Sequence, residues 1–235
     1  MINFVSLNAI VTDLLEIIRS AKVSRSEPIS KRQLEMWIHE YRSILIKQDL
    51  DKGKMPNPDY IQEIPALEVE IVDRTDGSTP VSGSYMLKSL LTVPNTLDLN
   101  NKAGFMYIGS IDGNEFQFVP EGRSTWQQYK KYTAHDNIVF LRNGYLYLFS
   151  VSPLRYITVR GVFEIPPEVS NFVNTNMSST RSSDIDDSYP IPINMLPTLK
   201  GMILRSELGI EVKSLSDLSN DSASTVESNV EEVKK

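Results

Sequence analysis

Side chains suited to nucleophilic or acid–base chemistry are scarce in this chain, which holds two histidines and no cysteine. His39 lies beside charged residues in a helical sequence, where a solvated or interface histidine is the expected role. His135 precedes Asp136, but its setting Thr-Ala-His-Asp-Asn is more typical of a turn than of a catalytic dyad. A serine nucleophile would need a Gly-x-Ser-x-Gly elbow, which the sequence lacks. We therefore expect no catalytic residue and no enzymatic activity.

Ligands for metals and phosphates are equally sparse. The acidic run 184–187, Asp-Ile-Asp-Asp, offers oxygen atoms for calcium or magnesium, but the glycine and distal glutamate of a calcium loop are absent. A solvated acidic loop explains it better. Glycine-rich phosphate loops are missing. The tyrosines of the run 129–132, Tyr-Lys-Lys-Tyr, could stack on nucleic-acid bases. The better interpretation is that these rings pack beneath a sheet while the lysines stay in solvent. We expect no metal and no cofactor.

Composition indicates an ordinary globular protein without nucleic-acid affinity. The 235 residues are 40% hydrophobic and 23% charged, enough for a core without disulfides or zinc. A net charge of −6 argues against gripping phosphates but is compatible with surrounding DNA without holding it. No apolar run approaches the roughly 18 residues that cross a bilayer, and the first residues do not resemble a signal peptide. We expect a chain that is neither exported nor embedded in a membrane.

The best-defined element is a helix from Ser30 to about Leu50. Ser30 and Gln33 form a capping-box pattern, while Pro28 and Gly53 mark its two ends. At 1.5 Å per residue the helix is roughly 30 Å long. Residues 7–21 are predicted to form a first helix. The long helix carries an apolar stripe at helical spacing, which is predicted to pack on this first helix and close a hairpin. The stripe is Leu34, Trp37, Ile38, Tyr41 and Leu45.

Turn residues change the pattern after residue 53. Met55-Pro-Asn-Pro excludes a helix, and Ile64 to Val72 alternates as a strand does. Two hairpins are predicted, one around Asp112-Gly113-Asn114 and one around Arg142-Asn143-Gly144. A further strand begins at Tyr156, and a short helix is expected from Ser124 to Tyr132. These hairpins indicate an antiparallel sheet or a small barrel.

The last third returns to helix. Pro166-Pro167 begins a short helix through Phe172, and residues 174–188 have a loop composition. Asn194 is predicted to cap a helix from Met195 to Leu208, with Gly209 as its terminating residue. The polar residues that follow cannot bury enough apolar surface to fold alone, so a partner is expected to hold them.

The expected fold is α+β. An N-terminal helical hairpin and a C-terminal helix form a helical part, with an inserted antiparallel β-sheet or small barrel and an extended polar C-terminal tail. The predicted boundaries are a helical hairpin at 1–53, the β region at 54–165, a loop and C-terminal helix packing on the hairpin at 166–210, and the tail at 211–235.

This order of elements resembles the head-to-tail connector proteins of tailed bacteriophages, the adaptor or ring proteins beneath the portal. The likeness is closest to ring proteins of crAss-like podoviruses. It is carried by Arg32-Gln-Leu-Glu-Met-Trp-Ile-His-Glu-Tyr-Arg-Ser-Ile-Leu-Ile-Lys-Gln-Asp and by Asp187-Ser-Tyr-Pro-Ile-Pro-Ile-Asn-Met-Leu-Pro-Thr-Leu-Lys. The large β insertion departs from the smaller all-helical adaptors.

The resemblance implies a virion structural protein, assembled in the host cytoplasm, that forms a ring of twelve subunits. The ring would join portal to tail, contact other tail proteins and surround the DNA exit channel without binding DNA specifically. Ring closure needs two different complementary faces on each subunit. Our candidates for subunit contacts are the apolar residues off the stripe of the long helix and the valines of the tail: Met36, Ile46, Leu50, Val226, Val230 and Val233.

An alternative function is a tail-associated β-rich binding module that recognises carbohydrate or another virion protein. Its support is the set of aromatic residues in the β region: Tyr107, Trp126, Tyr129, Tyr132, Tyr145 and Tyr147. A glycosidase with an Asp/Glu pair is a third possibility, since loop carboxylates cannot be paired from sequence.

Overall fold

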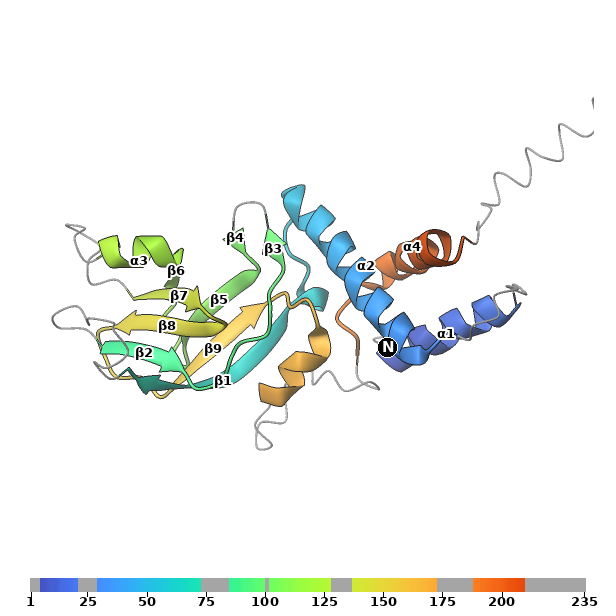
Figure 1. Ribbon diagram of the computed structural model, residues 1–235. Coiled ribbons are helices and arrows are strands. Elements are labelled where there is room, and N and C mark those ends of the chain that lie inside the picture. The colour runs from blue at the N-terminus through green and yellow to red at the C-terminus, as the bar shows by residue number, and fades with distance from the viewer. Residues whose placement is uncertain are drawn as a thin grey trace, which may run out of the picture. The chain divides into compact units, whose positions relative to one another are not determined.

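The computed structural model divides the chain into two units, residues 1–193 and 194–235. Figure 1 shows the described helices and strands. The residues whose structure is described are 5–20, 29–72, 85–99, 102–127, 137–172 and 188–209. The first unit contains α1 (Leu7–Ser20), α2 (Lys31–Asp51), η1 (Pro58–Tyr60), β1 (Gln62–Ile71), β2 (Tyr85–Ser89), β3 (Asp98–Leu99), β4 (Lys102–Ala103), β5 (Phe105–Ser110), β6 (Gln117–Phe118), α3 (Glu121–Gln127), β7 (Ile138–Arg142), β8 (Tyr145–Ser150), β9 (Tyr156–Gly161) and η3 (Pro166–Phe172).

The long helix α2 begins as the sequence predicts. The Ser30 hydroxyl accepts a hydrogen bond from the Gln33 N–H at 3.2 Å, which satisfies one of the free donors of the first turn. At the other end, the Gly53 N–H donates to the Leu50 carbonyl at 3.0 Å, and Gly53 has a φ of 75°, a conformation that favours glycine. The cap and the terminating glycine are therefore confirmed.

The buried face of α2 differs from the predicted stripe. Leu34, Ile38 and Tyr41 are buried as expected, but Trp37 and Leu45 are only half-buried. Arg42 and Ile46 take their places on the buried face. The prediction was wrong at these positions because it assigned the helix face by apolarity alone, whereas Arg42 is buried with hydrogen-bond partners.

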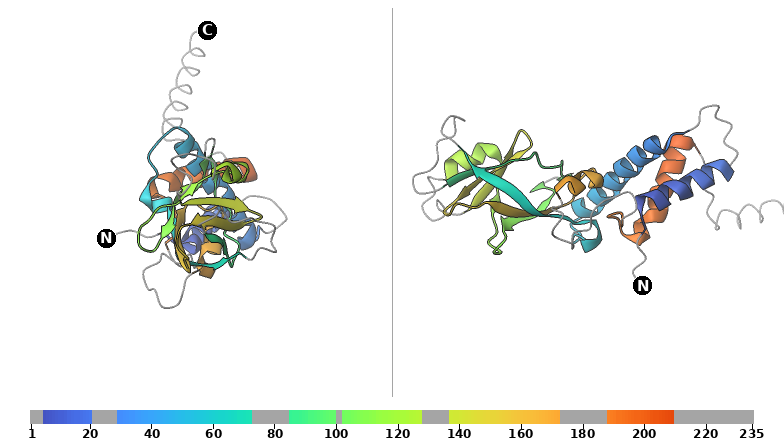
Figure 2. Two further views of the ribbon diagram at one scale, coloured as in Figure 1. Left: turned by 90° about the vertical axis from the view of Figure 1, so that its left-hand side faces the viewer. Right: turned by 90° about the horizontal axis from the view of Figure 1, so that it is seen from below.

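Seven strands form a nearly closed barrel in the order β5-β9-β1-β2-β8-β7-β6, antiparallel except for the β6–β7 pair. Strands β5 and β6 are the first and last strands of this order. The residues just before β6 form backbone hydrogen bonds with β5, which nearly closes the sheet. The Phe116 N–H donates to the Ile108 carbonyl at 2.7 Å, and Gly109 forms a bridge with Glu115. This confirms the predicted turn at Asp112-Gly113-Asn114 and an α+β fold with an inserted barrel. The curl of the sheet can be followed in Figure 2.

The second predicted hairpin is also confirmed. Strands β7 and β8 pair from Ile138 opposite Phe149 to Arg142 opposite Tyr145. Between them Asn143 and Gly144 have φ values of 51° and 80°. Two successive positive φ values define the turn whose twist matches a hairpin, which is why Asn-Gly occurs there.

Strand β1 has two partners along its length. Its first half pairs with β9, and residues Val69 to Ile71 also pair with β2. The register with β9 shifts between Ile64 and Leu67, where Pro65 lies. A proline has no N–H for a ladder, so an interior strand tolerates it at such a bulge.

The barrel interior is one apolar cluster, and a smaller cluster joins the barrel to α2. The smaller one contains Ile46, Tyr60, Leu97 and Val162, with Leu50 packed against it. The barrel cluster is Ile64, Leu67, Val69, Leu87, Val93, Phe105, Ile108, Phe116, Val139, Leu146, Leu148, Ile157, Val159, Phe163 and Val169.

Two predicted helix starts were wrong. Helix α3 begins at Glu121, earlier than the predicted Ser124. In the second unit, α4 (Leu196–Leu208) follows the short turn η4 (Ile193–Met195), and its capping residue is Met195 instead of Asn194. Gly209 ends α4 with a φ of 62°, as predicted. The short helix at Pro166–Phe172 is confirmed, in 3-10 form.

Candidate functional site

The most unusual buried side chain is Arg42, which is fully enclosed by the fold. Its Nε donates to the Pro190 carbonyl at 2.8 Å, and its Nη1 donates to the Phe163 carbonyl at 2.9 Å. Within the described residues Nη2 has no partner. Arg42 lies on α2, Phe163 just after β9 and Pro190 in the segment before the second unit. One guanidinium therefore joins three distant parts of the chain.

Tyr189 and His39 complete this cluster, which we call the Arg42 joint. A hydrogen bond of 2.8 Å joins His39 Nδ1 to the Tyr189 hydroxyl, and the Arg42 guanidinium lies 5.7 Å from the centre of the Tyr189 ring. The backbone of Tyr189 is also hydrogen-bonded: the Tyr189 N–H donates to the carbonyl of Val5, just before α1, at 3.0 Å. His39 is not the solvated side chain that the sequence predicted, since it is half-buried and its hydrogen-bond partner lies within the chain.

Burial sets the charges in the Arg42 joint. Desolvation and then the Arg42 charge lower the pKa of His39 from 6.5 to about 4, so the imidazole is neutral at pH 7. Desolvation raises the pKa of Tyr189 above its usual range, which keeps the phenol protonated. Arg42 also has a lowered pKa through burial, but a guanidinium stays charged in proteins. A neutral imidazole, a neutral phenol and an enclosed cation suit a structural joint better than a reactive site.

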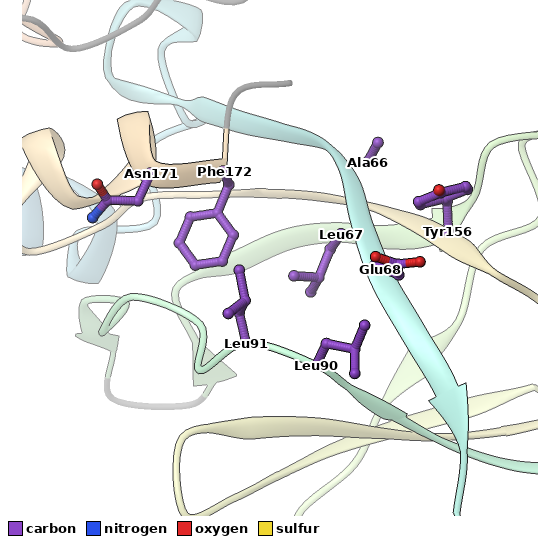
Figure 3. A pocket seen from close by; sticks show the side chains of 8 residues that line it. All are labelled: Ala66, Leu67, Glu68, Leu90, Leu91, Tyr156, Asn171 and Phe172. Carbon is purple, nitrogen blue, oxygen red and sulfur yellow. The ribbon is translucent and has the colours of Figure 1, made fainter. Parts of the chain in front are cut away.

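The described surface also has an apolar groove of about 300 Å³ (Figure 3). It lies beside the bulge of β1, between η3 and the residues that follow β2. Leu67, Leu91 and Phe172 point toward one another in it. Leu91 is 55% exposed and its neighbour Leu90 is 43% exposed. The remaining lining residues are Ala66, Glu68, Tyr156 and Asn171.

The tyrosines proposed for ligand stacking do not form an open aromatic surface. Tyr147 is buried, and Phe140 stacks on it with ring centres 5.4 Å apart. Arg160 lies over the Tyr107 ring at 5.4 Å, and Lys88 lies over the Tyr145 ring at 4.6 Å. A cation over each ring competes with a stacked ligand for that face. Trp126 is 69% exposed, and residues 129–132 lie outside the described residues.

The predicted contact residues have different environments. Met36 is 64% exposed, whereas Ile46 is fully buried in the cluster that joins α2 to the barrel. Ile46 is therefore unavailable to a second subunit in this conformation, and Leu50 is half-buried against the same cluster. The three valines of the tail lie outside the described residues, as do His135 and the acidic run 184–187.

Sequence reasoning missed Arg42. The available signal was its position: Arg42 is four residues from both Ile38 and Ile46, which places it on the buried face of α2. Elsewhere in the described ranges, no three His, Cys, Asp or Glu side chains are grouped to hold a metal ion. No helix among those residues has the length and apolar character to span a membrane.

Comparison with known protein families places this chain in one of them. A sequence model for a family described as phage tail ring protein 2 matches residues 9–230, which is most of the chain. No curated protein matches the sequence.

Proposed function

The chain belongs to the phage tail ring protein 2 family, and from this premise we propose that its ring joins the portal to the tail and surrounds the DNA exit channel. Membership makes it a structural component of the virion tail that oligomerises with other tail components. The family is a structural one and not an enzyme family. The proposal adds a ring of twelve subunits, a portal contact and assembly in the host cytoplasm.

The match over residues 9–230 is the observation that carries this function. The electrostatics of the barrel support passage of DNA without specific binding. Exposed arginines there are paired with carboxylates, at 3.3 Å for Arg155 with Glu68 and 3.1 Å for Arg160 with Glu63. The whole chain also carries a net charge of −6, which disfavours tight binding to phosphates.

The contacts that hold the ring are also proposals. We propose that Met36 and the tail valines Val226, Val230 and Val233 contact neighbouring subunits, because Met36 is exposed and apolar and the tail is too polar to fold alone. Ile46 is not among them. Helix α4 carries apolar residues at helical spacing, which are Leu196, Leu199, Ile203 and Leu204.

Imaging the purified chain tests the proposal. Electron microscopy and native mass spectrometry of the protein, alone and mixed with the portal of the same phage, should show closed rings of twelve subunits. Rings of another number would correct only the stoichiometry. A chain that stays monomeric in both conditions contradicts the proposal.

A carbohydrate-binding module is less well supported, because the described tyrosine rings are buried or covered by cations. Among the described aromatic side chains of that alternative, Trp126 is the most exposed. Glycan-array binding that Trp126→Ala abolishes would establish it, whereas absence of binding by the intact chain would remove it.

A further inference from the structure

Two apolar features of the described surface have opposite shapes. The first is the groove beside β1, which is concave. The second is a row of exposed residues along α2, spaced four apart, which we call the α2 ridge. Met36 on this ridge is 64% exposed and Ile44 is 37% exposed. The full ridge is Arg32, Met36, Glu40, Ile44 and Gln48, all exposed.

The groove exists because the barrel wall is incomplete beside β1. Strand β2 pairs only with Val69 to Ile71, so the first half of β1 has β9 on one side and no β2 partner on the other. Segment η3 covers part of this opening: the Gln62 amide donates to the Pro166 carbonyl at 3.2 Å, and Val169 joins the barrel core. Between η3 and Leu91 the groove is lined at its base by the core residue Leu67, which is buried, and at its rim by the exposed Leu90 and Leu91.

We propose that the α2 ridge of one subunit docks in the groove of the next subunit around the ring. This inference rests on the proposed function, since it names the two faces that ring closure uses. A ring with one kind of contact joins two different surfaces of the chain, one from each neighbour. An exposed helical ridge and an apolar groove are such a pair, and helices commonly bind grooves through apolar residues spaced along one face.

The sizes and charges of the two surfaces favour the α2 ridge as the occupant of the groove. Met36 and Ile44 are eight residues apart, about 12 Å along the helix, and Met36 is the more exposed of the two and therefore the side chain that enters the groove. A groove of about 300 Å³ is at the small end of the range for small-molecule sites but can accept apolar side chains. Charges are also complementary: the ridge presents Arg32 and Glu40, and the groove presents Glu68 with Arg155 beside it. The Glu68–Arg155 pair is exposed and weak, so it can exchange partners.

Cross-linking tests the contact directly, because the chain has no cysteine of its own. The variant Met36→Cys/Leu91→Cys, treated in the assembled state with a short bis-maleimide, should give a ladder of covalent multimers beyond the dimer. Each single-cysteine variant should give dimers at most. If Val230→Cys/Leu91→Cys gives the ladder and Met36→Cys/Leu91→Cys does not, the groove holds the tail of a neighbour and the proposal is wrong.

Charge substitutions separate this inference from the proposed function. Met36→Asp and Leu91→Asp should each weaken self-association at least tenfold, while an equimolar mixture should form heterodimers that do not grow, because one ridge and one groove remain intact. Ile111→Asp is the matched control, since Ile111 is 58% exposed against 55% for Leu91. Rings formed as well by both Asp variants as by wild type overturn the inference and the Met36 contact, and leave the proposed ring standing. A wild-type chain that never assembles overturns both.

Discussion

Arg42 and His39 must be in different charge states for the Arg42 joint to be stable. Arg42 must stay charged to donate to two carbonyls, while His39 must stay neutral beside it. A buried cation is costly unless its donors are used, and Arg42 uses two of its three nitrogens within the described residues. Removing either side chain should therefore have a measurable effect on the fold.

Arg42→Ala should lower the free energy of unfolding by about 3 kcal/mol, because it leaves the Phe163 and Pro190 carbonyls without their donor inside the protein. Urea denaturation followed by circular dichroism measures the change. Arg32→Ala, at an exposed position of the same helix, should change stability by less than about 0.5 kcal/mol. Equal losses for the two variants would show that Arg42 contributes no more than a surface arginine.

His39 should make stability depend on pH below neutrality. Its pKa is about 4 in the folded chain against 6.5 in the unfolded chain, so the unfolded chain binds more protons between these values. Stability from this group is complete above pH 6.5 and is lost as the pH falls toward 4, by up to about 3 kcal/mol. Denaturation at a series of pH values should show this slope for wild type and a shallower one for His39→Gln. Identical slopes would contradict the assignment.

At the scale of elements, glycines allow the barrel strands to approach neighbouring backbone. A Cβ on Gly104 would lie 2.7 Å from the Leu97 carbonyl oxygen and 3.1 Å from the Val162 carbonyl oxygen. Gly201 in α4 is different, since nothing lies within 4 Å of the added Cβ. These two glycines make a matched pair for the same substitution.

Gly104→Ala should destabilise the protein by about 2 kcal/mol, since the new Cβ meets backbone atoms that cannot move independently. Gly201→Ala should instead stabilise α4 by up to about 1 kcal/mol through helix propensity. Thermal and urea denaturation of both variants give the signs. A Gly104→Ala protein as stable as wild type would mean that β4 and β5 shift freely.

The local elements of this chain can be predicted from its sequence, whereas contacts between distant parts of the chain cannot. Ser30, Asn143 and Gly144 act through neighbouring residues, so the helix cap and the second hairpin can be predicted from them. The partners of Arg42 lie 121 and 148 residues away, and local patterns carry no information on such distances. The groove is equally long-range, because Leu91 and the η3 residues that line it come from distant parts of the chain.

At the scale of the whole molecule, the tail should matter for assembly and not for the fold. Deleting residues 211–235 should weaken self-association at least tenfold while leaving the unfolding midpoint of the barrel nearly unchanged, because so polar a segment cannot bury enough apolar surface to add much to the stability of the fold. Sedimentation velocity and calorimetry measure the two effects. The full-length variant Val226→Ser/Val230→Ser/Val233→Ser should reproduce the assembly defect. Normal rings from the truncated chain would exclude a role for the tail.

The bond between Phe116 and Ile108 has a consequence for folding in a crowded cell. An open sheet presents unpaired N–H and C=O groups at its outer strands, which can pair with other chains and start aggregation. Here the outer strands of the order, β5 and β6, lie next to one another through this contact. A ring protein that oligomerises necessarily meets other copies of its own chain. Because the two outer strands are joined to each other, these copies are protected from aggregation through sheet edges. Their other surfaces remain available for ring assembly.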